Sequence, residues 1–120
     1  MSTNLLAATT MTPQILLSGY LGTSDAAVYT CPALSSVKIA TAVICNVTTS
    51  AATVYIGGVP SGGTAGVSHH SIHAYPLAAG ESVSLTPYLG TAAMTAGDFI
   101  GGYCGTASAV TLFLTGTVSS

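Results

Sequence analysis

Charged residues are the scarcest class in this chain of 120 residues. Lys and Arg together occur once and Asp and Glu three times, so that only 3% of the residues are charged, where about a quarter is typical of soluble proteins. The four are Lys38, Asp25, Glu81 and Asp98. A single cation cannot neutralise a run of phosphates, and we therefore expect neither nucleic acid nor a membrane surface as a partner.

Long apolar runs are also lacking. Although 49% of the residues are hydrophobic, they are scattered among Thr, Ser and Gly and never form the roughly 18 consecutive apolar residues of a spanning helix. Residues 1–12 have neither the basic start nor the continuous apolar centre of a secretory signal. We interpret residues 1–12 as an extended N-terminal arm of the mature chain.

Cysteine is rare and its spacing is irregular. Cys31, Cys45 and Cys104 form an odd set without a C-x-x-C pair, which argues against a disulfide framework and against a structural zinc site. We expect buried free thiols. One bridge stays open as an alternative, because strands that lie face to face can bring two cysteines together.

What the chain does have is an alternation of apolar and polar residues with a period of two, which is typical of half-buried β-strands. The alternation and the turn residues between the runs predict about eight strands, near residues 14–20, 26–31, 36–48, 52–59, 69–76, 81–88, 98–104 and 109–118. The longest run has an apolar face made of Val37, Ile39, Thr41, Val43, Cys45 and Val47. Together the runs predict a core that contains Val37, Ile39, Val43, Val54, Ile56, Val83, Leu85, Leu112 and Leu114.

The number and spacing of these strands decide the expected fold class. Helical patterns are nearly absent, since the chain has little Glu, Lys, Arg or Gln for exposed helix faces. We predict an all-β protein: a single antiparallel β-sandwich, jelly-roll-like, over residues 13–120, preceded by the arm.

One short pattern occurs twice. Residues 77–83 and 94–100 both read apolar-x-Ala-Gly-acid-x-apolar. In each copy the glycine can supply the positive φ of a tight turn, and the acid that follows, Glu81 or Asp98, can accept backbone N–H groups. We predict two similar turns at the same end of the sandwich.

Three histidines, His69, His70 and His73, form the only cluster in the sequence suited to binding a metal or moving a proton. On an extended chain His69 and His73 share a face and His70 points the other way, a poor geometry for one metal. No acid lies nearby in the sequence to orient an imidazole. We expect polar surface or interface groups; the alternative is a contact between subunits that is sensitive to pH or bridged by a metal.

Patterns of catalytic and cofactor sites are missing. There is no G-x-S-x-G elbow and no glycine loop followed by the Lys, Ser or helix start of a phosphate site. We expect no catalytic residue, no cofactor and no resident metal.

The scarcity of charge predicts that other subunits cover this protein. A free domain normally stays soluble through a mixed charged surface, whereas interface cores are poor in charge and rich in tyrosine, and this chain has six Tyr. We predict a homo-oligomer, for which a trimer is one option. The expected interface residues are Leu5, Leu6, Met11, His69, His70 and His73.

Several segments resemble small virion proteins of tailed bacteriophages. The resemblance covers residues 13–118 and is clearest at 28–33, 37–48 and 52–56, then at 77–81, 96–100 and 109–112. This chain departs from many relatives in its near lack of Lys and Arg and in its three histidines. The resemblance implies a structural protein without enzymatic activity, located in the virion and assembled in the host cytoplasm, with the major capsid protein or tail proteins as partners.

Two locations in the virion follow from the resemblance. A stand-alone domain with a polar arm and no fibrous extension favours a capsid decoration (cement) protein, which oligomerises on the shell and stabilises it. A minor tail or tail-tip protein is the alternative. A carbohydrate- or receptor-binding module is a second alternative; it would need exposed Trp or clustered Tyr beside Asp and Asn, and this chain has no Trp.

Overall fold

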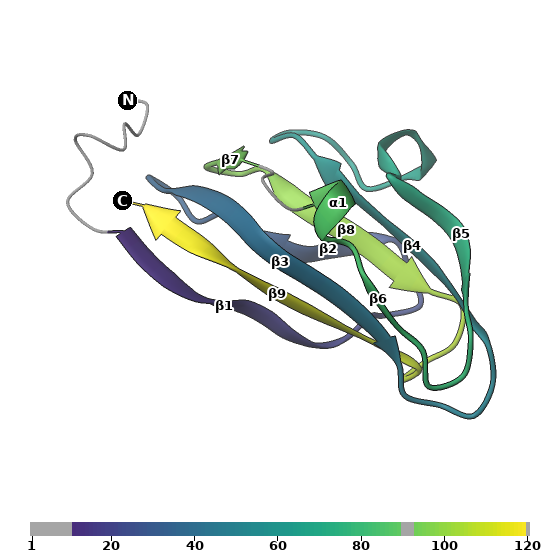
Figure 1. Ribbon diagram of the computed structural model, residues 1–120. Coiled ribbons are helices and arrows are strands. Elements are labelled where there is room, and N and C mark those ends of the chain that lie inside the picture. The colour runs from purple at the N-terminus through teal and green to yellow at the C-terminus, as the bar shows by residue number, and fades with distance from the viewer. Residues whose placement is uncertain (1–10, 90–92, 120) are drawn as a thin grey trace.

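Two antiparallel β-sheets pack face to face in the computed structural model, which describes residues 11–89 and 93–119 (Figure 1). The strands are β1 (Met11–Tyr20), β2 (Ala26–Thr30), β3 (Ser36–Asn46), β4 (Ala52–Val59), β5 (Ile72–Leu77), β6 (Ser82–Ser84), β7 (Ala93–Thr95), β8 (Phe99–Cys104) and β9 (Val110–Ser119). Two short helices, η1 (Val67–His69) and α1 (Thr86–Leu89), lie in the connections. The predicted all-β sandwich is confirmed.

The strand pairing is nested. In the five-stranded sheet the order is β1-β9-β3-β6, with β7 also paired to β3, and in the four-stranded sheet it is β2-β8-β4-β5. Thus β1 pairs with β9, β2 with β8, β3 with β6 and β4 with β5. The chain is in effect one long hairpin folded over on itself, which is the connectivity of a jelly roll.

All the predicted strands are present, with changes at their ends. β1 begins at Met11, so Met11 and Thr12, which we assigned to the arm, belong to a strand in the structure. β6 ends at Ser84 and α1 follows, because Pro87 lacks the N–H that a strand ladder needs and suits the first turn of a helix. The short β7 was not predicted.

The core follows the predicted alternation except in β3. Seven predicted core residues are buried, namely Val37, Ile39, Val54, Ile56, Leu85, Leu112 and Leu114. Val83 is half-buried and packs against this core. In β3 the register against β9 shifts between Ile39 and Thr41. This β-bulge inserts one residue and moves every later side chain to the other face.

The bulge overturns part of the predicted core. Ala42 and Ile44 are completely buried, whereas Val43 is half-buried and points outward. Val43 was therefore wrongly predicted as a core residue. The expectation that Val43, Cys45 and Val47 share the buried face with Val37 was wrong for the same reason.

The two similar turns form, but at opposite ends of β3. Their glycines have positive φ, 71° and 89°, and each acid accepts the backbone N–H of the residue three positions before it, at 2.8 Å for Glu81 and 3.0 Å for Asp98. The backbone carbonyl of Glu81 accepts the N–H of Asn46, the last residue of β3. The backbone carbonyl of Asp98 accepts the N–H of Cys31, which precedes β3. The prediction of one shared end was wrong, because the chain between the turns pairs first with the end of β3, as β6, and then with its beginning, as β7.

All three cysteines are free thiols. Cys31 and Cys104 are buried in the core, as expected, while Cys45 is half-buried on the outer face of the five-stranded sheet. Burial raises the pKa of the Cys31 thiol, and the negative charge of Asp98 raises it further, so that this thiol is protected by its protonation as well as by its packing.

Neither helix in the described part of the chain is long or apolar enough to cross a membrane.

Candidate functional site

Two histidines, an aspartate and two tyrosines meet on the outer face of the four-stranded sheet. His70 Nε2 lies 2.8 Å from Oδ2 of Asp25, and His70 Nδ1 lies 3.0 Å from Nδ1 of His73. The rings of Tyr55 and Tyr103 stack with their centroids 4.3 Å apart and their planes 4° from parallel. We call these five residues the histidine–tyrosine cluster.

The two tyrosines are placed by strand register. Tyr55 of β4 and Tyr103 of β8 are directly opposite each other. Tyr55 lies between Val54 and Ile56, both buried, and alternation therefore directs it outward. Directly opposite side chains on neighbouring strands are close enough for their rings to stack.

The two histidines are placed by local irregularities of the chain. The turn of η1 ends at His69, where His70 N–H donates to the Val67 carbonyl, and the chain then enters β5. In β5 an extra residue lies opposite Tyr55, and Ala74 has a positive φ of 52°. This bulge sets His73 against Tyr55, with ring centroids 5.2 Å apart in an edge-to-face arrangement.

The connection between β4 and β5 lies over the outer face of the four-stranded sheet, and two glycines make room for it. A Cβ atom on Gly57 would lie 1.7 Å from the carbonyl oxygen of His69, and one on Gly101 would lie 3.2 Å from the Cβ of Ala65. The backbone next to His70 therefore rests directly on β4 at Gly57. No larger residue fits at Gly57 without moving this connection.

Gly57→Ala should destabilise the protein by about 1–3 kcal/mol, a usual cost of overpacking, and should separate His70 from the tyrosines. Thermal unfolding and the ring-proton NMR signals of the cluster measure the two effects. Gly58→Ala is the matched control, because a Cβ there meets nothing within 4 Å. Equal stabilities of the two variants would contradict the packing of His69 on Gly57.

The structure corrects the expected arrangement of the histidines. His70 and His73 meet, whereas His69 lies apart from them with its ring near Gly63. The expectation that His69 and His73 share one face was wrong, because η1 and the β5 bulge interrupt the extended chain. The acid that orients His70 is Asp25, 45 residues away in the sequence.

Three members of the cluster were missed by sequence reasoning. Tyr55 and Tyr103 could have been predicted, since the alternation of residues places both on the outward faces of predicted strands. Asp25 had none, because it precedes β2 and reaches His70 only through the pairing of β2, β8 and β4 in one sheet. Its Oδ1 atom is buried and has no hydrogen-bond partner in the described part of the chain.

When both rings are neutral, the hydrogen bonds determine the tautomers. His70 Nε2 faces a carboxylate, so it carries a hydrogen and donates it to Asp25. Nδ1 of neutral His70 is then an acceptor, and His73 donates to it through its own Nδ1–H. Among the hydrogen bonds of the described residues, no hydroxyl or thiol joins this chain of Asp25, His70 and His73.

A ready-made metal site of three or more ligands is not found among residues 11–89 and 93–119.

Neither a family model, nor a curated protein, nor a solved structure matches this chain.

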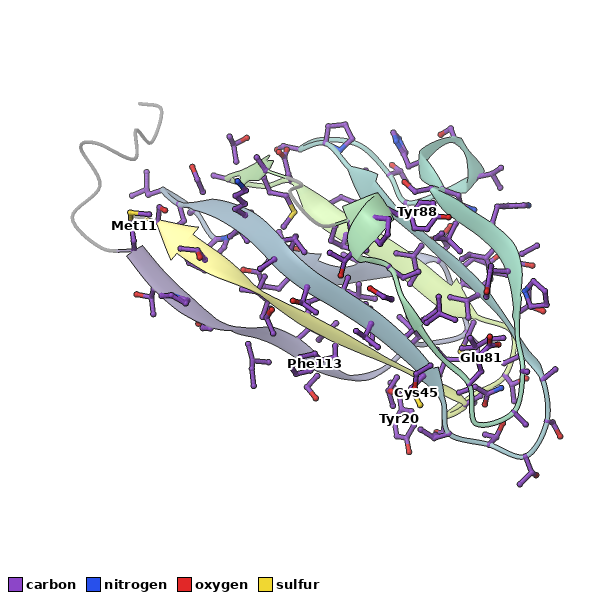
Figure 2. The ribbon with its side chains drawn as sticks, viewed as in Figure 1. Met11, Tyr20, Cys45, Glu81, Tyr88 and Phe113 are labelled. Carbon is purple, nitrogen blue, oxygen red and sulfur yellow. The ribbon has the colours of Figure 1, made fainter. Side chains whose placement is uncertain are left out.

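The second surface of interest is the outer face of the five-stranded sheet. Strand register arranges its side chains in three rows across the strands, namely Ile15, Thr115 and Thr41; Ser18, Phe113, Val43 and Ser84; and Tyr20, Thr111, Cys45 and Ser82. None of these residues is charged, and we call them the uncharged face. Figure 2 shows Phe113, Cys45 and Tyr20, which come from β9, β3 and β1.

The uncharged face exposes large apolar groups. Ile15 and Tyr20 are 60% and 61% exposed, and Phe113 in the middle row is 37% exposed. Two charges lie just beyond the rows: Lys38 pairs with Thr117 past the first row, and Glu81, whose carboxylate accepts the Ala78 N–H, directly precedes Ser82 of the third row. Hydrophobic groups gathered on one face without charge are typical of protein contact surfaces.

The predicted interface residues lie on different surfaces. Met11 starts β1 at the edge of the five-stranded sheet, opposite Ser119, and is 54% exposed. His69, His70 and His73 lie over the four-stranded sheet. Leu5 and Leu6 are outside the described residues. A role of these residues in an interface stays a prediction.

Proposed function

We propose that this chain is a non-enzymatic structural protein of a bacteriophage virion: a capsid decoration protein that forms a homo-oligomer on the shell and stabilises it. The uncharged face carries this proposal. It offers a sheet surface with exposed Ile15, Tyr20 and Phe113 and no charge, which suits burial against like subunits. Jelly rolls occur in viral capsid proteins and in lectins, so the fold is compatible with this role and does not decide it.

The few charges of the chain support the same role. Asp25 bonds to His70, Glu81 to the backbone of Ala78, and Asp98 to the backbone of Thr95 and Ser61. Two backbone N–H groups, with lesser help from the Thr95 hydroxyl, hold the pKa of Asp98 below its usual range. All three acids are thus engaged within their own fold, and Lys38 is the one other charged side chain. A partner is therefore held mainly by apolar burial and neutral hydrogen bonds, with few ion pairs.

The edge of the five-stranded sheet also supports association. β1 is an edge strand of ten residues, and none of them is charged. Natural proteins protect such edges with charges, prolines or β-bulges, because an open edge pairs readily with another chain. β1 has Pro13 and a bulge between Ile15 and Leu17 but no charge, so its edge is only partly protected. In a closed oligomer the edge is covered by a neighbouring copy.

Particles that carry this protein should retain it when the ionic strength is raised at constant pH, because salt screens charge pairs and not apolar contacts. Electron microscopy of the washed particles gives the number and place of the copies. Many copies spread over the shell are expected. Release by moderate salt would refute the apolar attachment, and a few copies confined to the tail would replace the decoration role with that of a minor tail protein.

One observation favours the carbohydrate-binding alternative. Tyr55 and Tyr103 form a tyrosine pair with an aspartate close by, the arrangement that the sequence alone did not reveal. Against it, one oxygen of Asp25 is bonded to His70 and the other is buried, so neither is free for a sugar hydroxyl. Binding to a glycan array that Tyr103→Ala abolishes would make the carbohydrate module the better proposal.

A further inference from the structure

The two facing imidazoles have the spacing of two ligands on one metal ion. Nδ1 of His70 and Nδ1 of His73 are 3.0 Å apart. Zinc–nitrogen bonds of about 2.0–2.1 Å in a tetrahedral site place two nitrogens roughly 3.3–3.4 Å apart. A metal ion can therefore replace the hydrogen between the two rings if they separate by a few tenths of an ångström, which a small rotation of the exposed His73 ring provides.

Asp25 supplies the group that usually stands behind a metal-binding histidine. Such histidines donate their other ring N–H to a carboxylate or carbonyl, which fixes the tautomer and the ring orientation. Asp25 accepts the Nε2–H of His70 at 2.8 Å, and the His70 side chain is only 4% exposed. The lone pair of His70 Nδ1 is thereby directed toward His73.

The tyrosine pair holds the two rings in place. Tyr55 lies against both imidazoles, with centroid distances of 5.6 Å to His70 and 5.2 Å to His73. The ring centroid of Tyr103 lies 6.1 Å from that of His70. Ligands that are oriented before binding lose less conformational entropy when the metal arrives.

We propose that His70 and His73 bind a divalent transition metal of the zinc type through their Nδ1 atoms, with Asp25 orienting His70. The hydrogen that lay between the rings moves to Nε2 of His73, so both imidazoles remain neutral. Water or a side chain of another molecule completes the coordination. Imidazole nitrogen favours zinc, copper and nickel over magnesium and calcium. This site is independent of the proposed virion role and replaces the expectation of no resident metal.

The test is a calorimetric titration of the full chain with Zn²⁺, repeated by competition with a chromogenic chelator. Saturable binding is expected, and His73→Ala should weaken it at least tenfold. Asp25→Asn should weaken it by about 10- to 100-fold, as for other carboxylates behind a ligand. His69→Ala is the matched control and should change the affinity less than twofold, since His69 lies apart from the pair.

Three further measurements test the site independently of the affinity for zinc. Thermal unfolding without metal shows whether His73→Ala is folded, which the exposure of this residue leads us to expect. Mg²⁺ should produce no binding, and nitrogen NMR should show the hydrogen of His73 on Nε2 once zinc is bound. Zinc binding of equal strength in His73→Ala would show adventitious binding elsewhere, and no saturable binding in the wild-type chain would overturn the site.

Discussion

Ile44→Ala should lower the free energy of unfolding by about 2–5 kcal/mol, whereas Val43→Ala, one residue before it, should cost about 1 kcal/mol or less. Ile44 is completely buried and pairs with the equally buried Leu112, so that truncation leaves a cavity in the core. Val43 lies on the uncharged face between Phe113 and Ser84. Solvent or neighbouring side chains can fill the space that its two methyl groups leave there.

The pair of variants tests the bulge in β3. Urea unfolding followed by circular dichroism measures both free energies. It should be run over a range of protein concentrations, because an oligomer that covers Val43 makes apparent stability depend on concentration. A larger cost for Val43→Ala at low concentration would mean that β3 runs without the bulge, as its plain alternation suggests.

Phe113→Lys should weaken self-association at least 100-fold and leave the domain folded. Phe113 lies in the middle row of the uncharged face, flanked by Ser18 and Val43. Association would bury the new ammonium group. The uncharged face itself has no acid to pair with it, and Glu81 beyond the third row is bonded to the Ala78 N–H. Burying an unpaired charge is unfavourable, and truncating a hot-spot residue at the centre of an interface typically lowers the binding free energy by about 2 kcal/mol or more. Analytical ultracentrifugation of the two proteins measures the change.

The control is Val67→Lys, which adds the same charge on η1, where Val67 is 71% exposed. This variant should keep the oligomeric state of the wild-type chain. Cys45 gives a second readout, since it lies in the row next to Phe113. Alkylation of Cys45 should be slow in the oligomer and fast in Phe113→Lys. If size and alkylation rate are the same in all three proteins, the uncharged face is not the interface.

The sequence by itself determined every strand except β7, and the turns at Gly80 and Gly97. Alternation in β4 and β9 reports local geometry, because successive side chains of an extended chain must point to opposite sides. It identified Val54, Ile56, Leu112 and Leu114 as core residues without reference to any other strand. The turn at Gly80 is also local, since a positive φ and an acid that accepts a backbone N–H are properties of adjacent residues.

Only the tertiary structure decided the register within β3 and the membership of the histidine–tyrosine cluster. Alternation predicts a face only while the strand is uninterrupted, and the bulge between Ile39 and Thr41 depends on the fit of β3 to β9. Likewise, Asp25 bonds to His70 although the two are 45 residues apart in the sequence. The connection between β4 and β5 brings His70 there, because it packs on Gly57 of β4, which belongs to the same sheet as β2. Contacts of this kind depend on how distant segments pack, and no local pattern records that.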